Sequence, residues 1–282
     1  MRQAIRTVLL TFALAAGNAA PLGAQDSDQP AEAVGENIFV GALALRQGEE
    51  LPVETSTVPA LGPVSRGLVA DAARFTRCAG LPRLPQLRRI VDGSPETGET
   101  QTALHYHIVR NGGCWGRAHF YVESPFYGVC NPHVVHEFLR ICRATYDRGA
   151  IYEQVLREYA PDLRLSRSNT FDHATLRRFR AREEARNGAR TKGARDYFFI
   201  AGCMVQLSPQ YALALLQEEP GSEREGQLRA VMISDGAPCV GGSVERVSVD
   251  PGQFRAFVAE AVYSWAVAVR RTGTLLPADI ES

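Results

Sequence analysis

A helical repeat of apolar residues near the C-terminal end constrains the fold more than any other feature of this sequence. From residue 254 to residue 265, apolar side chains recur every three or four positions, which is the period of one face of an α-helix. These side chains are Phe254, Phe257, Val258, Ala261, Val262 and Trp265. Asp250 and Pro251 supply a start signal for the helix, and Gly273 supplies a stop signal. The sequence therefore predicts a long amphipathic helix between them.

Three further helices are predicted before this one. Residues 197–207 are apolar enough to form a buried helix. Residues 208–216 begin with serine and proline, which suit the cap and the first turn of a helix. Residues 222–232 begin with Ser-Glu-Arg-Glu, which fits a capping box. Residues 196–272 are therefore predicted to form four helices, with a loop at 234–249.

Several short motifs follow one another in this C-terminal part. They are Gly202-Cys203-Met204-Val205, the run Ala212–Leu216, Pro220-Gly221-Ser222, Cys239 and Ala259–Tyr263. In this order they resemble the C-terminal module of uncharacterised exported proteins of proteobacteria. The resemblance covers about a quarter of the chain, and it implies a helical architecture and an exported location but no activity.

The N-terminal end has the three parts of a secretory signal peptide. Arg2 and Arg6 form a basic n-region, residues 7–16 form an apolar h-region, and Leu22-Gly23-Ala24 is a site of small residues for cleavage. The h-region is too short to span a bilayer as a finished helix. We therefore expect an exported protein, periplasmic or secreted, whose signal peptide is residues 1–24. An uncleaved membrane anchor is the alternative.

All six cysteines lie after the predicted cleavage site, and an even number in an exported protein favours disulfides. They are Cys78, Cys114, Cys130, Cys142, Cys203 and Cys239. One pairing is predicted, between Cys203 in the buried helix and Cys239 in the loop that must return across the helices. A covalent bond would fix this loop and stabilise the fold by about 3–4 kcal/mol. The alternative is two buried free thiols.

Upstream of the four helices the pattern is mixed. Residues 103–110 alternate and are rich in β-formers, a turn signal follows at 111–113, and 117–122 is a second strand candidate, so a hairpin is predicted. Two further strands are predicted at 38–40 and 87–91. From residue 131 the apolar spacing becomes helical, and helices are predicted at 131–146 and 150–159.

These expectations combine into an α+β fold, with a small β-containing N-terminal part and a four-helix, disulfide-stapled C-terminal part. The predicted divisions are a signal peptide at 1–24, a flexible tether at 25–37, a β-containing region at 38–130, a helical region with a basic segment at 131–195, and a helical C-terminal module at 196–282.

The basic segment is residues 164–195, which contain ten basic and three acidic residues. Nearly all of the basic residues are arginine, and Lys192 is the only lysine in the chain. We expect a solvated, arginine-rich helix without an obligate polyanion. The alternative is contact with an anionic surface of the cell envelope. Without residues 1–24, which hold Arg2 and Arg6, the chain has 29 basic and 31 acidic side chains, so a nucleic-acid binder is not expected.

A catalytic cysteine is one candidate for chemistry. The run Gly113-Cys114-Trp115-Gly116-Arg117-Ala118-His119 resembles the nucleophile segment of protein-glutaminase and transglutaminase enzymes. The resemblance implies Cys114 and His119 as catalytic residues of a cysteine-dependent amidohydrolase or deamidase, with the thiol pKa lowered at a helix start. The family also has a downstream histidine in an aromatic strand, and His133, His136 and His173 do not fit that context. The alternative is that Cys114 forms a disulfide.

A zinc site is the other candidate. His105 and His107 would share one face of the predicted strand, and His119 would stand across the hairpin, so three imidazoles could converge on a metal of a zinc-dependent hydrolase. The alternative is polar surface histidines. The expected function is an exported structural or binding protein of unknown ligand, without a cofactor.

Overall fold

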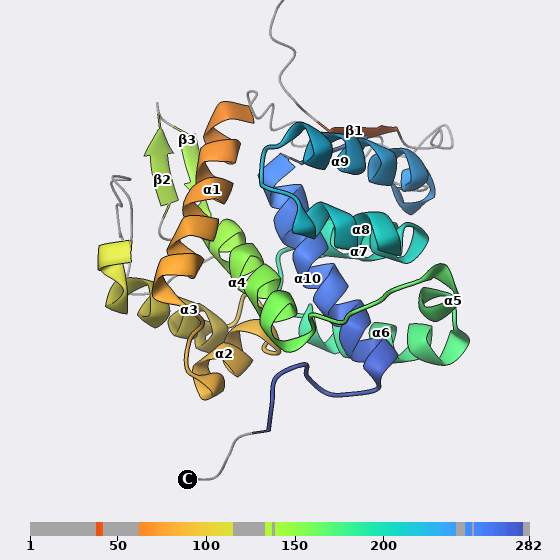
Figure 1. Cartoon of the computed structure of the whole chain (residues 1–282), viewed down its shortest axis with the longest axis horizontal. Coiled ribbons are helices and arrows are strands. Elements are labelled where there is room, and N and C mark those ends of the chain that lie inside the picture. The colour runs from red at the N-terminus through yellow and green to blue at the C-terminus, as the bar shows by residue number, and fades with distance from the viewer. Residues whose placement is uncertain are drawn as a thin grey trace, which may run out of the picture. The chain divides into compact units, whose positions relative to one another are not determined.

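The long helix α10 (Pro251–Arg270) lies at the centre of the structure (Figure 1). The computed structural model describes residues 38–41, 62–114, 133–136, 139–240, 246–249 and 251–278. Within these residues, α10 contacts helices from both halves of the chain. Almost every side chain from Pro251 to Ala268 is buried, so this helix has no solvent-facing stripe and is apolar on all sides apart from a few charged residues. The sequence predicted the helix but only one buried face.

The other C-terminal helices confirm the predicted four-helix arrangement. They are α7 (Lys192–Leu207), α8 (Pro209–Gln217) and α9 (Glu223–Asp235), followed by the 3-10 turn η2 (Ala237–Val240). The Ser222 side chain accepts a hydrogen bond from the Glu225 backbone N–H at 3.1 Å, as a helix cap should. Ser208, predicted as the cap of α8, makes no such bond, and α7 begins at Lys192, before its predicted start at residue 197. Local signals therefore locate these helices but not every boundary.

The predicted α+β class is wrong, because the described residues are mostly helical. The predicted strands at 87–91 and 103–110 are the helices α2 (Leu84–Val91) and α3 (Gly98–Arg110). The same region also forms α1 (Gly62–Ala79), where no strand was predicted, and the 3-10 turn η1 (Gly112–Cys114). In α3 the buried side chains are Thr100, Ala103, Leu104, His107 and Ile108, which is helical spacing. Residues 103–110 therefore satisfy an alternating and a helical pattern at once, and packing selects the helix. The second predicted strand, 117–122, lies outside the described residues.

Short strands are present, but they pair in two-stranded ribbons. β1 (Ile38–Gly41), at the predicted first strand, pairs antiparallel with β4 (Arg246–Val249). β2 (His133–His136) pairs antiparallel with β3 (Leu139–Cys142), so His133 lies opposite Cys142. The helix predicted from residue 131 is therefore wrong at its start.

A single helix, α4 (Arg143–Tyr159), runs through the glycine where two helices were predicted to separate. Gly149 serves the packing of α4 on α10, because a Cβ at this position would lie 2.5 Å from the Cβ of Ala256. The glycine therefore allows a close approach of the two helices and does not end α4.

The middle of the chain forms α5 (Arg167–Thr170) and α6 (His173–Arg186). Asp172 caps α6 by accepting a hydrogen bond from the Thr175 backbone N–H at 2.8 Å. Helix α6 packs against α10. All described residues belong to one compact unit, Val34–Ser282. Among the described helices none alone is long and apolar enough to cross a membrane. The pair α7 and α8, bent by 107°, has the length and composition of a membrane span only when the two helices are taken together.

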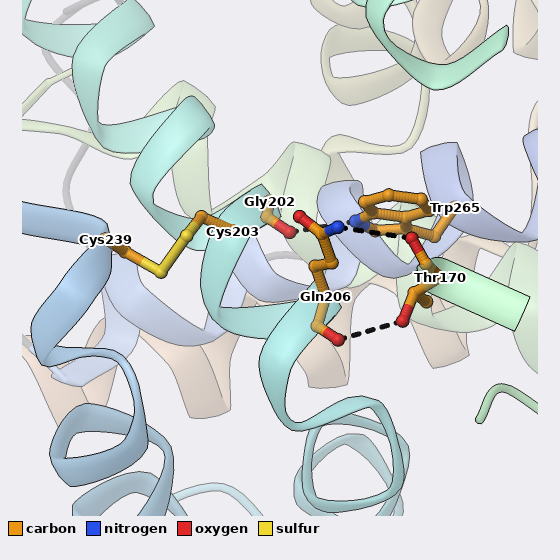
Figure 2. Close-up of a disulfide and its surroundings, with 6 residues drawn as sticks. All are labelled: Thr170, Gly202, Cys203, Gln206, Cys239 and Trp265. Atoms are coloured by element: carbon orange, nitrogen blue, oxygen red, sulfur yellow. Dashed lines mark hydrogen bonds between the residues drawn. A yellow bond between two sulfur atoms is a disulfide. The ribbon is translucent and has the colours of Figure 1, made fainter. Parts of the chain in front are cut away.

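A disulfide and two sets of hydrogen bonds hold α7 on opposite sides (Figure 2). On one side Cys203 is bonded to Cys239, with Cα atoms 5.7 Å apart, which is the pairing expected from the sequence. On the other side the indole N–H of Trp265 donates to the Gly202 carbonyl at 2.8 Å. Thr170 and Gln206 exchange two further hydrogen bonds, at 2.8 and 3.2 Å. The helix is therefore tied to α10, α5 and the segment after α9.

Candidate functional site

Arginines recur at every fourth residue along α6 and just beyond its end. They are Arg178, Arg182, Arg186 and Arg190. Within a helix, this spacing places side chains on the same face. The face packs against α10, and Arg186 and Arg190 are only 5% exposed. The expectation of a solvated basic helix is therefore wrong for the inner part of this segment.

The inner arginines converge on one carboxylate of the central helix. Glu260 is 1% exposed and accepts hydrogen bonds from Arg190 and, at 2.6 Å, from Arg186. Arg148 of α4 lies 3.7 Å from the other carboxylate oxygen. The Tyr152 hydroxyl lies between Glu260 and α2, and it donates to the Val91 carbonyl at 2.9 Å. Glu260 therefore joins four segments that are far apart in the sequence.

Two further carboxylates complete the cluster. Glu183 is fully buried and accepts hydrogen bonds from Arg186 at 2.8 Å and from the Asn187 amide at 3.0 Å. Asp92, at the end of α2, accepts from Arg182 at 3.0 Å and from the Tyr263 hydroxyl at 2.7 Å. We call this set the arginine–carboxylate network. Its members are Arg148, Arg182, Arg186, Arg190, Asp92, Glu183 and Glu260.

The charges of the network determine the protonation of its groups. Burial alone would raise the pKa of Glu260, but the guanidinium groups of Arg190, Arg186 and Arg148 outweigh it and hold the pKa well below its usual range. Burial raises the pKa of the Tyr152 hydroxyl well above its usual range. Burial lowers the pKa of Arg190, whose guanidinium lies over the rings of Phe198 and Phe257 at 5.0 and 5.6 Å.

These protonation states limit the chemistry of the network. A carboxylate whose pKa is held well below its usual range is a weak base, and a hydroxyl whose pKa is raised is a weak acid. Both groups are also buried, which separates them from any substrate in solvent. The arrangement therefore suits a structural connection between helices, and it does not suit general acid or base catalysis.

Cys114 does not have the thiol that the cysteine-enzyme hypothesis requires. Its sulfur is bonded to Cys78 of α1, with Cα atoms 5.6 Å apart. A disulfide sulfur lacks the thiolate that acts as a nucleophile. His119, the second residue of that hypothesis, lies outside the described residues. The arrangement matches the alternative in which Cys114 is half of a disulfide.

The premise of the zinc hypothesis is wrong, because His105 and His107 lie on helix α3 and not on a strand. Two residues separated by two positions on a helix point to different sides, and the structure buries His107 but leaves His105 partly exposed. The third proposed ligand, His119, is outside the described residues. Burial lowers the pKa of His107. Within the described ranges, no three His, Cys, Asp or Glu side chains gather as metal ligands.

A cavity of about 430 Å³ lies where the first turns of α9 and α10 meet Val69 of α1. Its lining includes the polar side chains Ser222, Glu223, Gln227 and Arg229. This volume lies in the range of small-molecule sites.

Comparison with known protein families, with curated proteins and with solved structures finds no match. The resemblances of the C-terminal motifs and of the Cys114 segment therefore stay predictions.

Two signals of the network are visible in the sequence. One is the four-residue arginine spacing from Arg178 to Arg190, and the other is Glu260, an acid within the apolar run of α10. An acid in a buried helix needs a cation, because an unpaired buried charge is strongly destabilising. The two signals together predict contact between α6 and α10.

Proposed function

We propose that the protein is an exported, non-catalytic structural or binding protein of the periplasm or the cell exterior. The observation that carries this proposal is the pair of disulfides, Cys78–Cys114 and Cys203–Cys239. Disulfides persist in oxidising compartments and are rare in the cytoplasm of most cells. The Arg2 and Arg6 n-region and the small-residue site at residues 22–24 give the chain a route to such a compartment.

The environments of two residues of the types that usually carry catalysis support a non-catalytic role. The Cys114 sulfur is used in a disulfide, and the buried Glu260 is neutralised by arginines. What the fold offers to a partner is its surface and the cavity beside α9 and α10. Binding and assembly are the functions that these features can perform.

Protein recovered from the producing cell tests this proposal. We expect N-terminal sequencing to show cleavage after Ala24, and peptide mapping without reductant to show both disulfides. Native protein should not react with iodoacetamide at Cys114. Cytoplasmic protein that keeps Met1 and carries a reactive Cys114 thiol would contradict the proposal and favour the cysteine enzyme.

A further inference from the structure

The outward face of α6 and its surroundings carry arginines that the network does not use. Arg167 of α5 and Arg177 and Arg180 of α6 are exposed. None of these arginines forms an ion pair within the part of the chain that the structure describes. Their charges are therefore available to a partner in solvent.

More arginines come from the end of the central helix. Arg178 donates to the Ala268 carbonyl at 2.8 Å, so the first half of α6 lies beside the C-terminal end of α10. This end carries the exposed Arg270 and Arg271. Residues 161–180 and 268–278 together hold seven arginines and two aspartates. We call this region the arginine end.

The two aspartates of the arginine end are already engaged. Asp162 accepts a hydrogen bond from Arg270 at 2.7 Å, and Asp172 caps α6. The bond from Arg270 lowers the pKa of Asp162, and the backbone hydrogen bond from Thr175 lowers the pKa of Asp172. Each carboxylate thus has a local partner, and the region keeps a clear excess of positive charge.

Arg271 has a backbone conformation that favours glycine. Its φ is +58°, and it follows the last residue of α10, where helices commonly place glycine in this conformation. A side chain here carries a strain that glycine would not. The left-handed residue ends α10, and it leaves the Arg271 side chain exposed on the surface.

An aromatic side chain accompanies these arginines. Phe171 is 46% exposed, and the guanidinium of Arg167 lies over its ring at 5.4 Å. Cationic groups next to an exposed aromatic ring are typical of surfaces that lie on anionic membranes, where arginines bind headgroup phosphates and the ring enters the interface.

We propose that the arginine end docks the protein on a membrane surface rich in anionic phospholipid. The partner is argued from charge complementarity and from the exposed Phe171, and lipid is preferred to nucleic acid because the proposed function places the protein outside the cytoplasm. The inference rests on that location. Guanidinium groups match the bidentate geometry of phosphate oxygens, so the headgroup phosphate is the group recognised.

Sedimentation with lipid vesicles tests the proposal on the purified chain. We expect binding to vesicles of phosphatidylcholine with 30% phosphatidylglycerol, weakened by salt, and little binding to phosphatidylcholine alone. Each arginine removed should weaken the affinity about fivefold. The triple variant Arg167→Gln, Arg177→Gln, Arg271→Gly should therefore lose roughly a hundredfold. Thermal unfolding should show that this variant folds normally, since glycine suits position 271.

A charge-matched control separates a defined surface from net charge. Arg89, Arg110 and Arg224 are exposed on α2, α3 and α9, and their change to Gln removes the same charge elsewhere. We expect this control to bind vesicles as the unaltered protein does. The proposal would be overturned if both triple variants lost the same affinity, or if the first variant bound as well as the unaltered protein. Binding to DNA or heparin but not to vesicles would also overturn it. Vesicle binding is measured on purified protein, and the location is measured on protein recovered from cells. The two proposals can therefore fail independently.

Discussion

The two faces of α6 carry the same side chain in opposite environments. Arg182 and Arg186 point toward α10 and bind carboxylates, whereas Arg177 and Arg180 point to solvent. The inner arginines are matched by Glu183, Glu260 and Asp92, which come from three different helices or their ends. The difference shows that local charge excess says little about a surface. The helical position of each arginine, and the presence of a buried acid on the partner helix, determine its role.

The largest expected effect is the loss of an inner arginine. Arg186→Gln leaves Glu183 and Glu260 buried with less compensating charge, which should lower the free energy of unfolding by about 3–5 kcal/mol. Arg177→Gln on the outer face should change it by less than about 0.5 kcal/mol. Urea unfolding of both variants measures the difference. Equal losses would show that the two faces do not differ.

Acid should weaken the ion pairs of the inner face. The pKa of Glu260 is lower in the folded chain than in the unfolded chain, so its contribution is complete above pH about 5 and is lost as the pH falls through the usual glutamate range near 4.3 and below. Each pKa unit of this difference corresponds to about 1.4 kcal/mol. Urea midpoints between pH 6 and pH 3 should therefore fall.

The variants Glu260→Gln and Glu184→Gln separate this contribution from those of other groups. His107, Asp162 and Asp172 also have lowered pKa values and act in the same direction. Glu260→Gln should have a shallower pH dependence, and Glu184→Gln, on the exposed side of α6, should keep the original one. The same slope in all three proteins would contradict the role of Glu260.

Arg178 lies between the two faces and should have an intermediate effect. Its guanidinium is half-buried and donates to the Ala268 carbonyl and to the Thr175 hydroxyl, both at 2.8 Å. Arg178→Gln removes the bond to the end of α10, and we expect a loss of about 1 kcal/mol. A loss as large as that of Arg186→Gln would place Arg178 in the network.

The smallest expected effect belongs to Arg167 on the surface. Its contact with Phe171 is an exposed cation–π interaction, so Arg167→Ala should cost about 0.5 kcal/mol in unfolding free energy. Differential scanning calorimetry can detect a change of this size. A loss above 2 kcal/mol would mean that the outer arginines also support the fold.

The success of sequence-based prediction differed along the chain. Among the helices from residue 192 to residue 270, α9 has a side-chain cap and α10 has a long apolar repeat, so both could be predicted. The start of α7 has neither signal, and it lies before the predicted one. Residues 103–110 satisfy the strand and the helix period together, and only contacts with distant residues decide between them. Residues 87–91 are a similar case, because Leu87, Ile90 and Val91 are apolar in either structure and lie on one buried helix face.

The network could be predicted only in part. The arginine spacing and the lone acid Glu260 are visible in the sequence, but Arg148 and Asp92 carry no local mark of burial. Their partners lie on other segments, and chain folding decides which acid meets which base. The Cys203–Cys239 pairing could be argued because both residues fall in the region whose helices were predicted.

The network also has a consequence for how this sequence can change over generations. If Glu260 alone became apolar, Arg186 and Arg190 would lose a buried counter-charge. If either arginine alone were lost, Glu260 would be a buried charge with less compensation, which is also destabilising. Replacing the whole set by apolar side chains of similar volume can leave stability unchanged or raise it. Each single substitution therefore destabilises the fold, although the replacement of the whole set does not. We expect relatives of this protein to keep positions 148, 186, 190 and 260 all charged or to lose the charges together.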